Sequence, residues 1–134
     1  MKKPISKSKA KAKAWNAFSR YIRTKYADKG GMCICYTCGK IAPIKEIQCG
    51  HGISGRNNAV LFMEEVCRPQ CVGDNVFGRG KQSIFTMKLI KEHGMAKYEE
   101  LVDLSNTTIQ YKTIDYVQIA EKYKEKLMDL APSK

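Results

Sequence analysis

Two stretches decide the fold, residues 35–39 (CYTCG) and residues 70–75 (QCVGDN). The first is typical of a zinc knuckle, in which two thiolates lie on a tight turn and a glycine gives the backbone room. Structural zinc takes four tetrahedral ligands, usually as two such pairs from distant parts of the chain. Cys71 and Asp74 have the spacing of a second pair, with a carboxylate where a thiolate is usual. The sequence therefore predicts a structural zinc site whose ligands are Cys35, Cys38, Cys71 and Asp74.

Other interpretations of the cysteines remain open at this stage. Cys67 is another available thiol and is the alternative to Asp74 as the fourth ligand. A redox pair would begin a helix after a strand, and no such context surrounds residues 35–38. The remaining alternative is a set of reduced, partly buried thiols. Cys33 and Cys49 have no evident partner, and we expect them to be small core residues.

Helical patterns lie on both sides of this cysteine-rich region. Aromatic and aliphatic residues recur every three or four positions over residues 14–27, which predicts an amphipathic helix with a core-facing stripe rather than a base-stacking platform. Residues 82–104 predict two helices separated near Gly94, and Thr113 can cap a last helix. Residues 30–80 predict loops and short strands, with candidates at 41–47 and 59–63.

These patterns predict an α+β protein with three parts. Residues 1–13 are expected to form a flexible basic arm, residues 14–104 the main domain, and residues 105–134 a linker and a C-terminal helix. No apolar run reaches the length of about 18–20 residues that crosses a bilayer. The lysine-rich N-terminus lacks the apolar core of a signal peptide, so we expect a cytoplasmic protein that does not contact membranes.

Positive charge is concentrated at the N-terminus. The 134 residues include 24 Lys and Arg against 13 Asp and Glu, for a formal net charge of +11, and residues 1–26 contain no acidic side chain. Such a block favours binding to a polyanion, most simply a nucleic acid, over the alternative of a solvated lysine tail. The side chains predicted to bind nucleic acid are Arg20, Arg23, Lys25, Arg56, Arg79 and Lys81.

One of the two histidines lies between glycines, in the stretch 48–52 (QCGHG). The glycines beside His51 leave room for a substrate backbone to approach, so His51 is a catalytic candidate, with a purely structural role as the alternative. His93 precedes Gly94 at a predicted helix end, where it can stabilise the C-terminus without any further role.

Taken in order, these motifs resemble the phage NinG (Rap) recombination proteins. The resemblance covers nearly the whole chain. It rests on the series Trp15-x-x-Phe18-Ser19-x-Tyr21-Ile22-Arg23, Cys35-x-x-Cys38, Gly50-His51, and Gln70-Cys71-x-x-Asp74-Asn75-x-Phe77, followed by Gly80 and a helix. That family is similar in turn to the His-Me finger (HNH) nucleases, including the endonuclease VII group.

The resemblance implies a zinc-stapled ββα-metal core, flanked by helices, that cuts branched DNA such as D-loops and Holliday junctions. His51 would be the general base, and Asn75 would help to hold a catalytic Mg²⁺ or Mn²⁺. The zinc would be structural. The implied partners are branched DNA and other phage recombination proteins, and a homodimer would suit a symmetric junction. A phage-encoded protein would act in the host cytoplasm.

Three features differ from the pattern of these families. Asp74 replaces a cysteine, and Gly50 stands where nuclease relatives often have an acidic metal ligand. Glu65 and Lys81 lie where NinG-like sequences tend to carry asparagine. The catalytic metal therefore lacks an obvious carboxylate unless Asp74, Glu64 or Glu65 supplies one. Two other functions remain: a non-catalytic, zinc-stapled DNA-binding accessory protein, and an RNA-binding knuckle protein.

Overall fold

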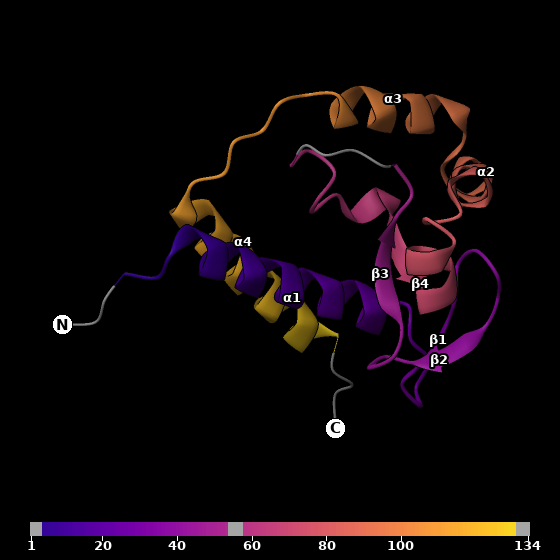
Figure 1. The fold of residues 1–134 in the computed structure, drawn as a ribbon, viewed down its shortest axis with the longest axis horizontal. Coiled ribbons are helices and arrows are strands. Elements are labelled where there is room, and N and C mark those ends of the chain that lie inside the picture. Colours follow the sequence, from indigo (N-terminus) through magenta and orange to yellow (C-terminus); the bar gives the residue numbers. More distant parts are fainter. Residues whose placement is uncertain (1–3, 54–57, 131–134) are drawn as a thin grey trace.

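The computed structural model describes residues 4–53 and 58–130. Two long helices lie together on one side of the molecule, and short strands and two further helices lie on the other (Figure 1). In chain order the elements are α1 (Lys7–Lys25), β1 (Met32–Ile34), β2 (Ile41–Pro43), β3 (Gln48–His51), η1 (Glu64–Val66), β4 (Cys67–Gln70), η2 (Gly73–Phe77), α2 (Gln82–His93), α3 (Met95–Ser105) and α4 (Thr113–Asp129). The predicted α+β class is confirmed.

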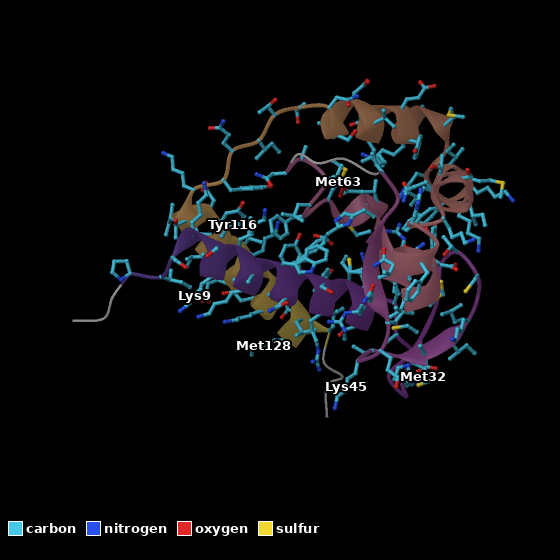
Figure 2. The ribbon with its side chains drawn as sticks, in the orientation of Figure 1. Lys9, Met32, Lys45, Met63, Tyr116 and Met128 are labelled. Atoms are coloured by element: carbon cyan, nitrogen blue, oxygen red, sulfur yellow. The ribbon has the colours of Figure 1, made fainter. Side chains whose placement is uncertain are left out.

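The helices α1 and α4 pack along each other and form much of the apolar interior (Figure 1). Near the N-terminus of α1, the small side chains of Ala10 and Ala14 are buried against Tyr116 and other residues of α4. Tyr116 is labelled in Figure 2, beside the N-terminal half of α1. Farther along, the ring of Phe18 meets a tyrosine ring of α4 edge to face. Close contact between the first and last helices therefore organises the core.

Helix α1 begins at Lys7, seven residues before the predicted start. Ser6 precedes it, and its hydroxyl accepts a hydrogen bond from the backbone N–H of Lys9 at 3.3 Å, as a helix N-cap does. The expectation of a flexible arm is thus wrong for residues 7–13, which are helical. Burial of Ala10 against α4 explains the extension, because a distant segment stabilises a turn that its own sequence does not specify.

Four short strands form two antiparallel hairpin-like sheets. β1 pairs with β2, with Met32 opposite Pro43. β3 pairs with β4, from Gln48 opposite Gln70 to His51 opposite Cys67. The predicted strand at residues 41–47 is present over Ile41–Pro43, whereas residues 59–63 contain no strand and lie in turns. The second sheet carries a histidine at one end and leads into η2 at the other.

Helices α2 and α3 separate at Gly94, as predicted. This glycine has a φ of +86°, a value that side-chain-bearing residues rarely adopt, so the chain can end one helix and begin the next. Thr113 is the first residue of α4 and does not cap it; the cap position is Lys112, whose backbone N–H donates to the Asp115 carboxylate at 2.7 Å. Within the described residues, none of the helices combines the length and apolarity needed to cross a membrane.

Candidate metal centre and histidine site

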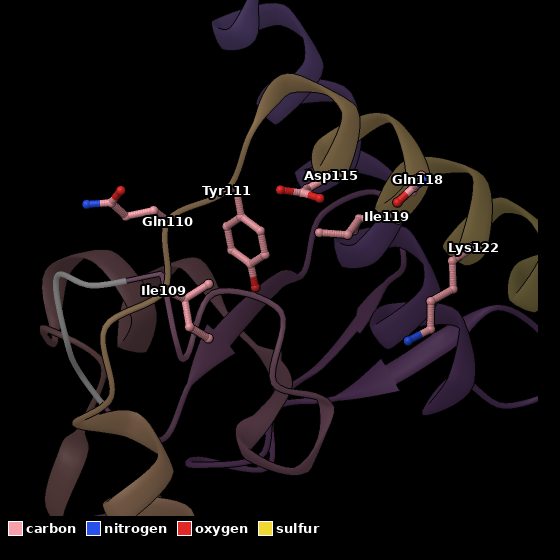
Figure 3. Close-up of a pocket in the computed structure, with 7 residues that line it drawn as sticks. All are labelled: Ile109, Gln110, Tyr111, Asp115, Gln118, Ile119 and Lys122. Carbon is pink, nitrogen blue, oxygen red and sulfur yellow. The ribbon is translucent and has the colours of Figure 1, made fainter.

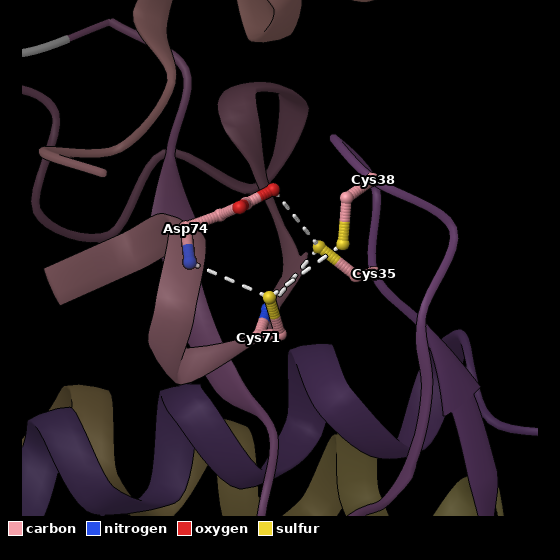
Figure 4. Close-up of side chains that lie close together, drawn as sticks. All are labelled: Cys35, Cys38, Cys71 and Asp74. Carbon is pink, nitrogen blue, oxygen red and sulfur yellow. Dashed lines mark hydrogen bonds between the residues drawn. The ribbon is translucent and has the colours of Figure 1, made fainter. Parts of the chain in front are cut away.

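Three thiols and one carboxylate converge where the turn after β1 meets the chain leaving β4 (Figure 4). They belong to Cys35, Cys38, Cys71 and Asp74, and their ligand atoms all lie within 4.8 Å of one another. The Sγ atoms of Cys38 and Cys71 are 3.6 Å apart, and Cys35 Sγ lies 3.7 Å from Asp74 Oδ2. Tetrahedral zinc with Zn–S bonds of about 2.3 Å separates its sulfur ligands by about 3.8 Å. The cluster can therefore hold a metal ion such as zinc.

Backbone amides support the thiolate form of these ligands. The N–H of Cys71 donates to Cys35 Sγ at 3.2 Å, and the N–H of Asp74 donates to Cys71 Sγ at 3.4 Å. Burial disfavours ionisation of Cys35, but hydrogen bonds from the backbone N–H groups of Cys71, Cys38 and Thr37 outweigh it and lower the pKa of that thiol to about 7. Because metals bind the thiolate, this environment favours Cys35 as a metal ligand near neutral pH.

A chain of hydrogen bonds fixes the carboxylate of the cluster. The hydroxyl of buried Thr37 donates to Asp74 Oδ2 at 2.6 Å, and it accepts from Nε2 of Gln70 at 3.0 Å. The same Gln70 nitrogen donates to the carbonyl of Gly80 at 2.7 Å. The bond from Thr37 lowers the pKa of Asp74, so the carboxylate is ionised and oriented before a metal arrives.

The remaining cysteines are not among the four converging ligands. Cys67, the alternative fourth ligand, is fully buried in the main apolar core beside Cys49, and burial raises the pKa of its thiol. Cys33 is fully buried too, and its thiol donates to the carbonyl of Arg23 at 3.1 Å. The expectation that Cys33 and Cys49 are small core residues is confirmed.

His51 ends β3 and packs under Trp15 of α1. The two rings are stacked, with centroids 5.4 Å apart and planes inclined by 20°. His51 Nε2 lies 3.2 Å from the carbonyl oxygen of Leu61. Because a carbonyl only accepts hydrogen bonds, Nε2 must carry the proton, which leaves a lone pair on Nδ1 of the neutral ring. Burial lowers the pKa of His51 and favours this neutral form.

The sequence pattern does not predict the stacking of Trp15 on His51. The spacing of Trp15 with Phe18 and Tyr21 predicts a core stripe, and the last two are indeed buried. Trp15 is only half-buried and also contacts the apolar core. Nothing in the local sequence of α1 distinguishes Trp15, which contacts His51 of β3, from the other residues of the apolar stripe.

Asn75 lies in η2 and is joined to the strand that carries His51. Its Nδ2 donates to Oε1 of Gln48, the first residue of β3, at 2.7 Å. An adjoining pocket of about 360 Å³ is lined by Trp15, Ser19, Arg23, Ile47, Gln48, Cys49 and Asn75. Within the described residues no hydrogen bond links His51 to Asn75. Trp15 is the common neighbour, since it lines this pocket and stacks on His51.

No side chain fits at position 50 without movement of Gln70. A Cβ atom on Gly50 would lie 2.2 Å from Oε1 of Gln70 and 3.0 Å from its Cβ. Gln70 is itself fully buried and fixed by the bonds of its nitrogen to Thr37 and Gly80. Its Oε1 is a buried oxygen without a hydrogen-bond partner in the described part of the chain. Gly50 is thus required by packing.

The three carboxylates considered as ligands of a catalytic metal, those of Glu64, Glu65 and Asp74, do not converge on His51 and Asn75 in hydrogen bonds of the described residues. The carboxylate of Glu64 accepts from the hydroxyl of Tyr123 at 2.9 Å and from Nζ of Lys126 at 2.7 Å, both on α4. Glu65 is exposed, and Asp74 belongs to the cysteine cluster. Glu64 therefore ties α4 to the segment before β4.

Five of the six basic residues predicted to bind nucleic acid lie in the described part of the chain, three on α1 and two after η2. Arg20 and Lys25 are exposed on α1, whereas the guanidinium of Arg23 donates to Ser19 and to the carbonyl of Ile44. Arg79 and Lys81 are exposed on the turn that follows η2. Arg56 lies outside the described residues.

A separate apolar pocket of about 390 Å³ lies between the connection before α4 and α4 itself (Figure 3). Its apolar walls include Ile109, Tyr111 and Ile119. None of the predicted site residues that the structure describes lines it, so it lies apart from the cluster and from His51.

Comparison with known proteins agrees with the order of the motifs. No curated protein and no solved structure matches the chain. A family model described as Bacteriophage Lambda NinG protein matches residues 2–132, which include the cysteine cluster, His51 and the helices on both sides. The chain therefore belongs to the NinG family.

Proposed function

We propose that the protein is a metal-dependent endonuclease that hydrolyses phosphodiester bonds in branched recombination intermediates such as D-loops and Holliday junctions. One observation carries the proposal: the cysteine cluster fixes Asn75, through the adjacent Asp74, against the strand that carries His51. The order β3, β4 and then helix is also the order expected of a ββα-metal core. Membership of the NinG family supports the recombination context.

His51 is the general base in this proposal. Its Nε2 is occupied by the Leu61 carbonyl, so the lone pair on Nδ1 is the one available to take a proton from an attacking water. The stacked Trp15 limits rotation of the ring and covers one of its faces. The lowered pKa of His51 keeps the imidazole unprotonated, and therefore active, below its ordinary value of 6.5.

Asn75 is the residue proposed to hold a catalytic Mg²⁺ or Mn²⁺. Its amide nitrogen takes the bond to Gln48, and within the described residues its oxygen has no hydrogen-bond partner, so that oxygen is available to a hard cation. A bound divalent ion would neutralise charge that develops on the scissile phosphate and the leaving oxygen. The zinc in the cysteine cluster would have only the structural role of positioning η2.

Exposed cations provide the proposed contacts to DNA. Lysines at positions 7, 9, 11 and 13 are exposed on the first turns of α1, where Arg20 and Lys25 continue the positive surface. Lysines at a helix N-terminus oppose the positive end of the helix dipole, so nearby phosphates would relieve this repulsion as well as neutralise charge. Arg79 and Lys81 are near Asn75 in sequence and would hold the backbone beside the site.

The packing of Gly50 favours a second candidate, a DNA-binding accessory protein that does not cut. Gln70 occupies the space into which a carboxylate at position 50 would project. A catalytic ion would then have Asn75 as its one assigned side-chain ligand, which is a weak site for Mg²⁺. This candidate predicts tight binding to junctions without hydrolysis.

The decisive experiment is cleavage of a labelled four-way junction and its matched linear duplex. Zinc-loaded protein is freed of unbound metal by gel filtration and then given Mg²⁺, Mn²⁺ or Ca²⁺, which avoids chelators that strip the cysteine cluster. We expect cutting of the junction with Mg²⁺ or Mn²⁺. His51→Ala should reduce the cutting rate by at least about 100-fold, the range of a lost general base, while junction affinity stays unchanged.

The second histidine supplies the matched control. His93→Ala, at the end of α2, should cut at nearly the wild-type rate once its folding has been checked by circular dichroism. In wild type the rate should persist below pH 6.5 and fall only when His51 becomes protonated. Equal rates for His51→Ala and wild type would refute the general-base role. Tight binding with no hydrolysis in either ion would favour the accessory protein.

A further inference from the structure

An exposed aromatic side chain stands two residues after Asn75. Phe77 is 83% exposed, the largest exposed fraction among the large apolar side chains of the described residues. Val76 is 53% exposed beside it, so η2 ends in a small apolar tip. A single exposed apolar side chain is ordinary, but two adjacent ones directly after Asn75 make this tip a candidate contact for a ligand of the site.

The tip is held by a well-bonded turn that begins at the cysteine cluster. The backbone N–H of Gly78 donates to the carbonyl of Gly73 at 2.7 Å, and that of Gly80 donates to the carbonyl of Asp74 at 2.8 Å. Asn75 N–H donates to the carbonyl of Cys71 at 2.8 Å. Phe77 is therefore presented on backbone that is tied to the cluster on one side and to the start of α2 on the other.

Cations follow the tip directly. Arg79 and Lys81 are exposed, and both have positive φ values, 54° and 46°, which turn the chain sharply after Phe77. Neither forms an ion pair with the acidic side chains that the structure describes. An aromatic ring followed in the chain by two exposed cations is complementary to a nucleobase whose neighbouring phosphates carry negative charge. Aromatic residues and arginine are also enriched at protein interfaces, but the second cation, Lys81, and the net charge of +11 favour a polyanion over a protein contact.

We propose that Phe77 recognises the branch in DNA by stacking on a base that is unstacked there. A continuous duplex covers both faces of each base, whereas a branch point leaves base faces open to an inserted apolar side chain. Arg79 and Lys81 contact phosphates next to that base, and Asn75 lies near the strand to be cut. The inference rests on the proposed function and adds to it the element that distinguishes branched from linear DNA.

Equilibrium binding separates this role from catalysis. Fluorescence anisotropy is measured on a four-way junction and on a linear duplex of the same sequence, with Ca²⁺ in place of Mg²⁺ so that neither is cut. Phe77→Ala should lose about tenfold in affinity for the junction, as expected for one lost stacking contact, and keep its affinity for the duplex. Phe77→Trp should retain the preference, and its additional tryptophan emission should be quenched by the junction.

A matched control removes an equally exposed apolar side chain elsewhere. Met128 is 75% exposed near the end of α4 (Figure 2), and Met128→Ala should bind both DNAs as wild type does. Because the side chains of Phe77 and Met128 are both exposed, both alanine variants should remain folded. Thermal melting of each variant checks this expectation.

The outcomes distinguish the inference from the proposed function. If wild type prefers the junction and Phe77→Ala keeps that preference, the stacking role is wrong while the proposed function stands. If wild type binds the junction and the duplex equally, branch recognition is wrong and both proposals fall. If Phe77→Ala instead dissociates a dimer of the DNA-free protein in sedimentation, the tip contacts a second copy of the chain, which also overturns the inference.

Discussion

The α1–α4 helical pair and the cysteine cluster are held together by different means. In the helical pair, apolar rings interlock: Phe18 is fully buried, and its centroid lies 4.9 Å from that of Tyr123 and 5.5 Å from that of Phe62. At the cluster, strands of three or four residues and turns surround four polar ligands instead. Strands this short are marginal alone, and only a small apolar cluster of Cys33, Cys35, Ile47 and Cys71 supports them, so a metal bound by the four ligands would add stability there.

The difference shows how a small protein can combine a stable apolar core, the α1–α4 pair, with a polar site at the cysteine cluster. The helical pair buries apolar area independently of pH or metal, whereas we expect the cluster to be fully stable only when its thiols are deprotonated and bind a metal. The residues proposed for function, including Asn75 and Phe77, follow the cluster directly along the chain. We therefore expect changes at the cluster to remove function while the helices persist.

The largest expected effect comes from breaking the cluster. Cys71→Ser should lose nearly all bound zinc, because structural zinc contributes roughly 10–16 kcal/mol of binding free energy in small zinc domains and a serine hydroxyl is a poor ligand. Zinc content by mass spectrometry measures the loss, and far-ultraviolet circular dichroism should still report the helices. Cys33→Ser is the matched control, since that buried thiol packs beside Cys35 and Cys71 but is not one of the four ligands, so the variant should keep one zinc per chain. Full zinc occupancy in Cys71→Ser would contradict the assignment.

Breaking the helical pair should give the complementary result. Phe18→Ala removes a fully buried ring and should lower the free energy of unfolding by about 3–5 kcal/mol, as for other core phenylalanines. Urea denaturation measures the change, and the protein that remains folded should hold zinc as wild type does. A loss of zinc in proportion to the loss of stability would show that the two regions unfold as one unit.

The smallest expected effect comes from the hydrogen bond that orients the carboxylate ligand. Thr37→Val preserves the volume of the side chain but removes the hydroxyl that donates to Asp74 at 2.6 Å. Loss of such a supporting bond should weaken zinc binding by about 10–100-fold, with little change in helix content. Competition with a colorimetric zinc chelator measures the affinity, and Thr37→Ser should restore most of it. Identical affinities for Thr37→Val and wild type would show that Asp74 does not bind the metal through this arrangement.

Prediction from sequence succeeded where a short pattern carries its own physical reason. Gly94 separates two helices because of its conformational freedom. The spacing of the cysteines likewise predicts the convergence of three thiols that the structure shows. It was less successful where one segment depends on a distant one. The alternating lysines and alanines of residues 7–14 suggest a solvated arm, yet Ala10 and Ala14 are buried because α4 covers them.

The same limit applies to the site. Glycine at position 50 appears in the sequence as the loss of an acidic ligand, because nothing local reveals that Gln70 fills the adjacent space. The stacking of Trp15 on His51 is equally invisible, since it joins the first helix to a strand more than thirty residues later. Both are contacts between elements, which periodicity and spacing do not encode.

The close approach of Gln70 to Gly50 also makes the two positions epistatic. Introducing aspartate at position 50 alone places its Cβ within 2.2 Å of the Gln70 amide oxygen and should be harmful, however useful a carboxylate would be there. Truncation of Gln70 alone opens space but removes the donor to Thr37. An acidic residue at position 50 can therefore be introduced only after Gln70 has been replaced by a smaller residue. That replacement in turn requires another hydrogen-bond donor to the Thr37 hydroxyl.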